Sequence, residues 1–99
     1  MVQPNGFNFS AGATATAAAL SSAAKTPYSG FTVKVDPAAT GTVYFGYTSG
    51  VTAGTAAATD GLPLTAGQSY FFPLQSVNDV NALYMISSTG TIKVFVEGC

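Results

Sequence analysis

The sequence predicts an all-β fold: a single small β-sandwich or jelly-roll-like barrel with an extended N-terminal arm. The chain has 99 residues, which is room for one domain only. Short segments of alternating apolar and polar residues recur along it, and turn residues separate them at intervals of about 8 to 12. No segment has the periodicity of an amphipathic helix. We therefore expect an arm at residues 1–12 and a β-sandwich domain at residues 13–99.

The first ten residues contain Pro4, Gly6 and two phenylalanines, Phe7 and Phe9, spaced two apart. Without a helix cap or a strong turn signal, this segment reads as extended. The phenylalanine pair then either fixes the arm to a partner or folds back onto its own domain.

Residues 13–20 are rich in alanine, which favours a helix, but Thr14 and Thr16 are β-branched and oppose one. The alternation of Ala and Thr favours a strand. No Lys or Arg precedes residues 11–24, and hydroxyl residues interrupt the apolar run, so we do not expect a secretory signal peptide.

Five clearer strands follow, each with alternating faces. They are expected at residues 30–36, 42–47, 69–74, 82–87 and 91–97. Residues 48–61 form a loop with a turn signal at Asp60-Gly61, and residues 51–53 are a candidate short strand within it. Residues 63–67 turn again. Residues 88–90 are expected to be a hairpin loop between the last two strands.

Several strands are apolar on both faces, although a two-sheet domain needs only one inward face for each strand. Because interface cores are enriched in Tyr and Phe, the surplus aromatic residues are candidate contacts between subunits. The alternative is that they are ordinary exposed apolar residues, which every protein carries. The candidates are Phe7, Phe9, Tyr44, Tyr70, Phe72, Tyr84 and Phe95.

Charged residues make up only 7% of the chain, with a net charge of −1. A typical soluble domain carries about 25%, and a folded chain of this size exposes on the order of 5,000 Å². So few charges predict a subunit that neighbouring subunits cover. Three basic residues cannot neutralise a run of phosphates, so nucleic acid is not an expected partner. No apolar run approaches the roughly 20 residues of a transmembrane helix, so no membrane partner is expected.

Catalysis and cofactor binding are not expected. The chain lacks histidine, the commonest general base and metal ligand, and its one cysteine, Cys99, cannot build a zinc site or an internal disulfide. A chain with no disulfide suits a reducing cytosol. Ser22-Ala23-Ala24-Lys25 matches an S-x-x-K nucleophile motif, but the elements that accompany that motif are absent. Asn78-Asp79 with Asn81 reads as a turn, since one carboxylate coordinates Ca²⁺ poorly.

Residues 31–96 resemble a group of small β proteins of tailed-phage particles. The similarity is carried by six short motifs. These are Gly-Thr-Val-Tyr-Phe-Gly at 41–46, Gly-Val-Thr-Ala at 50–53, Gly-Leu-Pro-Leu at 61–64, Ala-Gly-Gln-Ser at 66–69, Leu-Tyr-Met-Ile-Ser at 83–87 and Ile-Lys-Val-Phe-Val at 92–96. The longer loop at residues 54–60 and the N-terminal arm depart from the pattern, and either is a candidate to reach a neighbour.

This resemblance implies a virion structural protein with no catalytic residues or cofactors. It implies a capsid decoration, or cement, protein that is made in the host cytoplasm and binds the major capsid protein on the capsid surface. We expect a homo-oligomer, and a trimer would match a threefold site. One alternative is a phage tail or head–tail joining component. Another is a carbohydrate-binding surface module, which would stack sugars on Tyr44, Tyr47, Tyr70 or Tyr84.

Overall fold

The computed structural model describes residues 7–22, 27, 29–55, 58–77 and 79–98. Within these ranges the backbone forms eight strands and one short 3₁₀ helix, η1 (Val80–Ala82), with no α-helix. The strands are β1 (Phe7–Ala13), β2 (Ala18–Ala19), β3 (Gly30–Val35), β4 (Val43–Gly46), β5 (Leu62–Leu64), β6 (Ser69–Pro73), β7 (Tyr84–Ser87) and β8 (Ile92–Gly98). The all-β prediction is confirmed.

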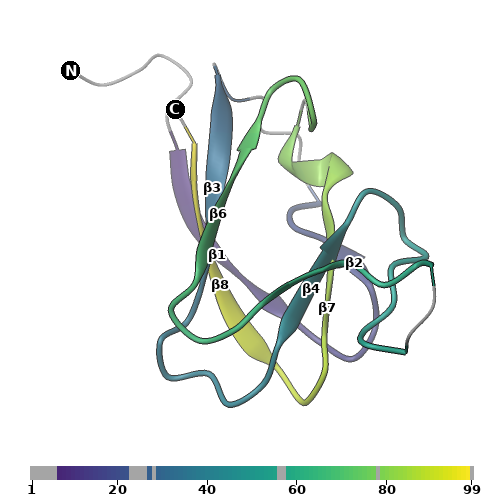
Figure 1. Cartoon of the computed structure of the whole chain (residues 1–99). Helices are drawn as coiled ribbons and strands as arrows, with labels where there is room; N and C mark the ends of the chain where they lie inside the picture. Colours follow the sequence, from purple (N-terminus) through teal and green to yellow (C-terminus); the bar gives the residue numbers. More distant parts are fainter. Residues whose placement is uncertain (1–6, 23–26, 28, 56–57, 78, 99) are drawn as a thin grey trace.

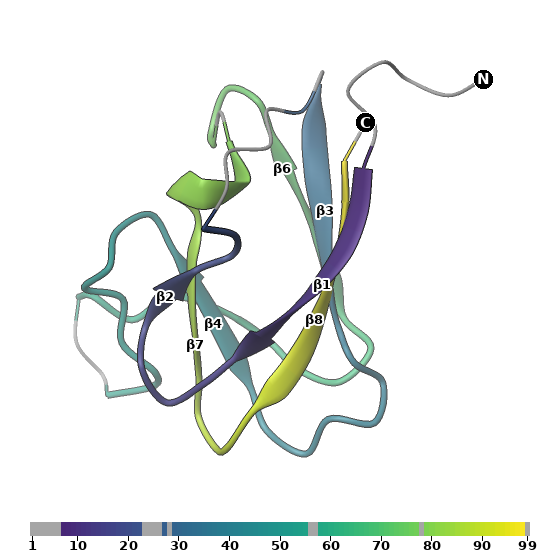
Figure 2. The ribbon, with the colours of Figure 1, turned by 180° about the vertical axis from the view of Figure 1, so that it is seen from behind.

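The strands form two four-stranded antiparallel sheets that face each other as a β-sandwich (Figures 1 and 2). Sheet A has the strand order β1-β8-β3-β6, and sheet B has the order β2-β7-β4-β5. The pairs β1–β8, β2–β7, β3–β6 and β4–β5 alternate between the two sheets. The four antiparallel pairs thus form one long double-stranded ribbon that wraps around the core. This is the strand order of a jelly roll.

The core lies between the sheets because one face of each long strand is apolar. In β8, Ile92, Val94 and Val96 are buried while Lys93, Phe95 and Glu97 are exposed, as the alternation predicts. In β3, Phe31, Val33 and Val35 are buried in the same way. From sheet B, Val43, Phe45, Leu64 and Met85 close the core. Ser87 is the one buried polar residue among those described, and its hydroxyl donates to the carbonyl of Gly90.

Five strands that the sequence predicts are present as β3, β4, β6, β7 and β8, with ends shifted by one or two residues. The prediction of a hairpin at residues 88–90 is wrong. β7 pairs with β2 and β4, whereas β8 pairs with β1 and β3, so this turn carries the chain from one sheet to the other. β5 was not predicted, because three residues with a central Pro63 resemble a turn.

The N-terminal segment is part of the domain from residue 7 onward. β1 pairs with β8 over its whole length, from Phe7 opposite Gly98 to Ala13 opposite Ile92. The extended conformation is as predicted, but a separate arm is not found at residues 7–12. Of residues 13–20, Ala13 ends β1 and Ala18–Ala19 form β2, and of residues 51–53 only Thr52 makes an isolated bridge, to Asp60. Residues 1–6, Lys25, Asn78 and Cys99 lie outside the described residues.

Candidate functional site

An apolar patch follows the open side of the sandwich, where β5 and β6 are the last strands of their sheets. We call it the edge patch, and it consists of Tyr47, Leu62, Tyr70 and Leu74, whose side chains are 38% to 61% exposed. Two hollows make it continuous. One, of about 470 Å³, is lined by Tyr47, Leu62 and Tyr70, with buried Phe45 and Phe72 also in its wall. The other, of about 360 Å³, is lined by Tyr47 and Leu74.

The sequence places Tyr70 in this patch through the strand period. Tyr70 shares a face of β6 with Phe72, and both point toward sheet B. Phe72 is 3% exposed, but Tyr70 lies two residues farther along, where sheet B ends in the short β5, and it remains half open. The two rings meet edge to face, with centroids 4.9 Å apart. Burial of the neighbour therefore holds the exposed ring in place.

The described parts of the loop between β4 and β5, residues 48–55 and 58–61, lie against sheet B on the side away from sheet A (Figure 1). Val51 is buried by contact with Gly46, where an added Cβ would come within 2.7 Å of Val51 Cγ2. Gly54 has φ +67° and approaches Tyr44, whose hydroxyl would be 2.7 Å from a Cβ at that position. Glycine is therefore required at both positions for the loop to lie on the sheet.

Asp60 closes this loop with its carboxylate. Its Oδ1 accepts hydrogen bonds from Thr52 Oγ1 at 2.6 Å, from the Thr55 amide at 3.0 Å and from Thr55 Oγ1 at 2.9 Å. The Thr52 amide donates to the Thr59 carbonyl, and the Gly61 amide donates to the Thr52 carbonyl. This carboxylate is thus engaged in structure, since charge-assisted bonds of this kind are the stronger ones.

Replacing Asp60 by Ala is expected to lower the free energy of unfolding by about 1 to 3 kcal/mol, because Thr52 and Thr55 lose a charged acceptor. Urea unfolding measures the loss, and limited proteolysis should find new cleavage within residues 48–61. Asp36→Ala is the control: Asp36 Oδ1 accepts only the Ala38 amide among the bonds described here, at 3.0 Å, and a smaller loss is expected. Equal losses in the two variants would contradict this role of Asp60.

Charge is unevenly distributed over the molecule. Lys34, Lys93 and Glu97 lie on the outer face of sheet A, around the exposed ring of Phe95. Lys34 is opposite Phe95 in register, and Lys93 Nζ is 6.0 Å from the ring centre. The hollow of about 540 Å³ on this face is lined by Lys34, Phe95 and Glu97. Three charged side chains thus lie on this face, together with the exposed rings of Phe71 and Phe95.

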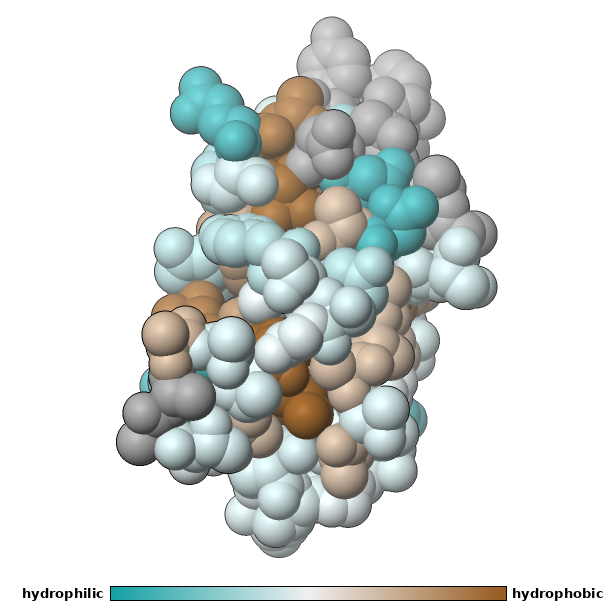
Figure 3. Space-filling model, turned by 90° about the vertical axis from the view of Figure 1, so that its right-hand side faces the viewer, coloured by the Kyte–Doolittle hydropathy of each residue, from teal (hydrophilic) through white to brown (hydrophobic). Residues whose placement is uncertain are grey.

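The strands of sheet B contain no charged residue. The outer face of sheet B carries Tyr44, Tyr84 and Ile86, all half-buried. Figure 3 shows the side with β2, β7 and the 48–61 loop as mostly pale and tan, with strongly hydrophilic side chains gathered mainly toward its upper end. Among the described residues that line the two hollows of the edge patch, Asp60 alone is charged. The edge patch thus adjoins the weakly charged side.

The seven aromatic residues that the sequence proposed for subunit contacts do not form one site. Phe7 and Phe9 are half-buried on the inner face of β1, with ring centroids 6.0 Å apart. Tyr44 and Tyr84 lie on the outer face of sheet B, Tyr70 in the edge patch, and Phe95 on the outer face of sheet A. The proposal is wrong for Phe72, which is a core residue.

Leu62 and Leu74, in the edge patch, and exposed Phe71, on the outer face of β6, were not among those candidates. Tyr47 was considered only as a sugar-stacking residue. Leu62 and Leu74 each stand next to a proline, Pro63 and Pro73. Pro63 begins the turn predicted at residues 63–67, and Leu74 ends the strand predicted at residues 69–74, so neither prediction marks an exposed surface. No other signal in the sequence marks them.

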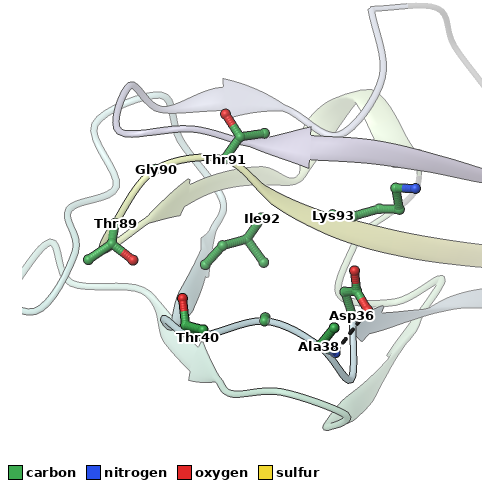
Figure 4. Close-up of a pocket in the computed structure, with 9 residues that line it drawn as sticks. Asp36, Ala38, Thr40, Thr89, Gly90, Thr91, Ile92 and Lys93 are labelled. Atoms are coloured by element: carbon green, nitrogen blue, oxygen red, sulfur yellow. Dashed lines mark hydrogen bonds between the residues drawn. The ribbon is translucent and has the colours of Figure 1, made fainter.

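A hollow of about 410 Å³ lies at the end of the sandwich, between the β3–β4 loop and the turn into β8. Figure 4 shows Ile92 and the side chains of Thr40 and Thr89 around it, with Lys93 directed away from them. Asp36, the one carboxylate in its lining, accepts from the Ala38 amide, drawn as a dashed line. The carboxylate of Asp36 therefore holds the start of the β3–β4 loop.

Metal-binding and membrane-spanning features were sought in the part of the chain that the structure describes. No three His, Cys, Asp or Glu side chains cluster there in a way that would hold a metal ion. In the same residues, no helix has the length and apolar character needed to cross a bilayer.

No known family model, curated protein or solved structure matches this chain. Any function proposed for it therefore depends on its composition, its surface and the sequence motifs at residues 31–96.

Proposed function

We propose that the chain is a non-catalytic structural protein of a tailed-phage particle, a decoration protein that binds the major capsid protein through the edge patch. The observation that carries this proposal is the joint arrangement of exposed apolar side chains and charge. The edge patch joins four large exposed apolar side chains around two hollows whose described lining has Asp60 as its one charged residue, and Asp60 is held by Thr52 and Thr55. On the outer face of sheet A, the charged side chains of Lys34, Lys93 and Glu97 are exposed to solvent.

The size of the domain suits this role. A stable protein–protein contact buries about 800 Å² on each partner. The accessible surface of the chain is 5357 Å², so one side of the molecule suffices for such a contact. Repeated over a closed shell, contacts of modest free energy add up through multivalency and resist internal pressure. Decoration of the outer capsid surface, after synthesis in the host cytoplasm, is the location that this proposal implies.

A non-catalytic role agrees with the chemistry of the described residues. The chain has no histidine and a single cysteine. The carboxylates of Asp36, Asp60 and Asp79 each accept backbone or hydroxyl hydrogen bonds that close a turn or cap η1. These groups are engaged locally, which supports a role in packing rather than in proton transfer.

Copy number in purified particles tests the proposal. Particles from cells that make the chain are separated on a density gradient, and stained gels compare the chain with the major capsid protein. Copies on the order of hundreds for each particle support decoration of the shell. Six or twelve copies would place the chain on the tail axis, and its absence from particles would overturn the virion proposal.

A second candidate is a carbohydrate-binding module, and one observation favours it. Tyr47 and Tyr70 both line the 470 Å³ hollow, together with the hydroxyl residues Thr48 and Thr59. Aromatic rings beside polar groups are a common way to hold a small polar ligand. A glycan array decides between the two. Sugar binding that both Tyr47→Ala and Tyr70→Ala abolish would support a carbohydrate-binding module in place of a decoration protein. If no sugar binds, the decoration protein remains the proposal.

A further inference from the structure

The four edge strands of the two sheets are not equally protected against pairing with another chain. β2 has two residues, β5 contains Pro63 and β6 contains Pro73. Short length and proline are two ways in which proteins prevent edge-to-edge association. β1 has seven residues, Phe-Asn-Phe-Ser-Ala-Gly-Ala, with neither proline nor charge. It lies nearest the viewer in Figure 2, at the margin of sheet A.

The hydrogen-bonding direction of β1 follows from its neighbour. The Asp36 amide donates to the Lys93 carbonyl at 3.0 Å, so the Lys93 backbone points toward β3. Successive residues of a strand point to opposite sides, so Ile92, Val94 and Val96 point toward β1. Their partners in β1 are Ala13, Ala11 and Phe9. Asn8, Ser10 and Gly12 therefore direct their amide and carbonyl groups to the open edge.

We infer that β1 pairs antiparallel with β1 of a second copy, about a two-fold axis at Ser10. The axis keeps the inner faces of the two sheets on the same side, so odd-numbered residues must lie opposite odd-numbered residues. When the axis passes through Ser10, the outward amide and carbonyl groups of Asn8 lie opposite those of Gly12 in the second copy. Those of Ser10 lie opposite the same groups of Ser10 in the second copy. All seven residues of β1 are then paired.

Side-chain sizes agree with this register. On the inner face, Phe7 lies opposite Ala13 of the second copy, and Phe9 lies opposite Ala11, so a large residue faces a small one in every pair. Phe7 and Phe9 are half-buried in the isolated chain, and the pairing would cover more of their surface. Moving the axis to Phe9 would place two phenylalanines opposite each other and leave Gly12 and Ala13 unpaired. Cross-strand pairs that fit well are the unit of sheet stabilisation.

Charges on the outer face also agree. Glu97 is the β8 neighbour of Asn8, and Lys93 is the β8 neighbour of Gly12. Because Asn8 lies opposite Gly12 of the second copy, Glu97 of one chain and Lys93 of the other share a row of the joined sheet. Opposite charges therefore share a row across the axis twice, but three strand spacings, about 14 Å, separate them. Their attraction is weak at that distance, so the fit of Phe7 and Phe9 against Ala13 and Ala11 determines the register.

The pair would make one eight-stranded sheet from two copies of sheet A and would leave both edge patches free. It specifies a two-fold dimer, where the sequence led us to expect a trimer. The inference does not depend on the proposed function, since the edge patch takes no part in it.

Disulfide trapping tests the register directly, in a Cys99→Ser background. Ser10→Cys would place two thiols opposite each other, where the Cα atoms of a hydrogen-bonded pair are about 5.5 Å apart, within disulfide range. Mild oxidation is expected to convert most of this variant to a covalent dimer. Asn8→Cys is the matched control, exposed on the same face of β1 but opposite Gly12, and little dimer is expected. Equal cross-linking of the two variants would overturn the register.

Sedimentation of the unmodified chain tests the dimer itself. A concentration-dependent monomer–dimer equilibrium is expected, and Ser10→Lys should weaken it at least tenfold by opposing two ammonium groups at the axis. Ser10→Thr should not weaken it, because the backbone groups are unchanged. Thermal unfolding of the dilute monomer, which both variants should share with the parent chain, confirms that each folds. A chain that remains monomeric at millimolar concentration, or a dimer that Ser10→Lys leaves intact, would overturn the inference.

Discussion

Phe72→Ser is expected to lower the free energy of unfolding by about 3 to 5 kcal/mol, the usual cost of removing a large core side chain. Phe72 is 3% exposed, and its ring centroid lies 5.7 Å from that of Phe31 and 6.3 Å from that of Phe45. The substitution opens a cavity where both sheets meet and places a hydroxyl in it. Since small domains have only about 5 to 15 kcal/mol of stability, urea or thermal unfolding should show a midpoint far below that of the parent chain.

Phe95→Ser is the matched control, because it removes the same ring from the opposite face of sheet A. Phe95 is 41% exposed among Lys34, Lys93 and Glu97. Its removal should change the free energy of unfolding by less than about 1 kcal/mol, as at most surface positions. If Phe95→Ser lowers the free energy of unfolding as much as Phe72→Ser does, Phe95 belongs to the core and is not exposed.

This contrast shows where prediction from the sequence succeeds. In β3 and β8, apolar and polar residues alternate, so the pattern identifies both the strand and its buried face. In Tyr70-Phe71-Phe72 every residue is aromatic. The pattern then establishes that Tyr70 and Phe72 share a face but not which face is inside, because that depends on which strand of the other sheet lies opposite.

Which strands pair with each other could not be predicted from the sequence for a similar reason. Residues 88–90 have the composition of a hairpin loop, and the same turn serves equally to pass from one sheet to the next. A hairpin and a crossover between sheets differ in which strands pair with β8. Its partners are β1 and β3, which lie far from it in the sequence. Residues 7–12 resembled an arm because their partner, β8, lies at the other end of the chain. The edge patch likewise exists only once Tyr47, Leu62 and Tyr70 converge from three segments.

Tyr47→Asp combined with Leu74→Asp is expected to weaken binding to the capsid at least 30-fold, since the loss of an interface anchor costs about 2 kcal/mol or more. Both side chains are exposed in the isolated chain and border the same hollow, so the monomer should still fold. Binding is measured by adding the purified variant to particles stripped of the chain and counting bound copies. A carboxylate would be buried against the capsid without a partner, which is why the effect should be large.

The control for this pair is Phe95→Asp, which introduces the same charge on the side of the molecule that already carries Lys34 and Lys93. Binding should change less than threefold if the edge patch faces the capsid, because the outer face of sheet A would then face solvent. The reverse result, with Phe95→Asp releasing the chain and the double variant remaining bound, would assign the capsid contact to the outer face of sheet A. Both outcomes compare how much an added carboxylate weakens capsid binding on the edge patch and on the outer face of sheet A. The comparison is sensitive because only 7% of the residues in the chain are charged.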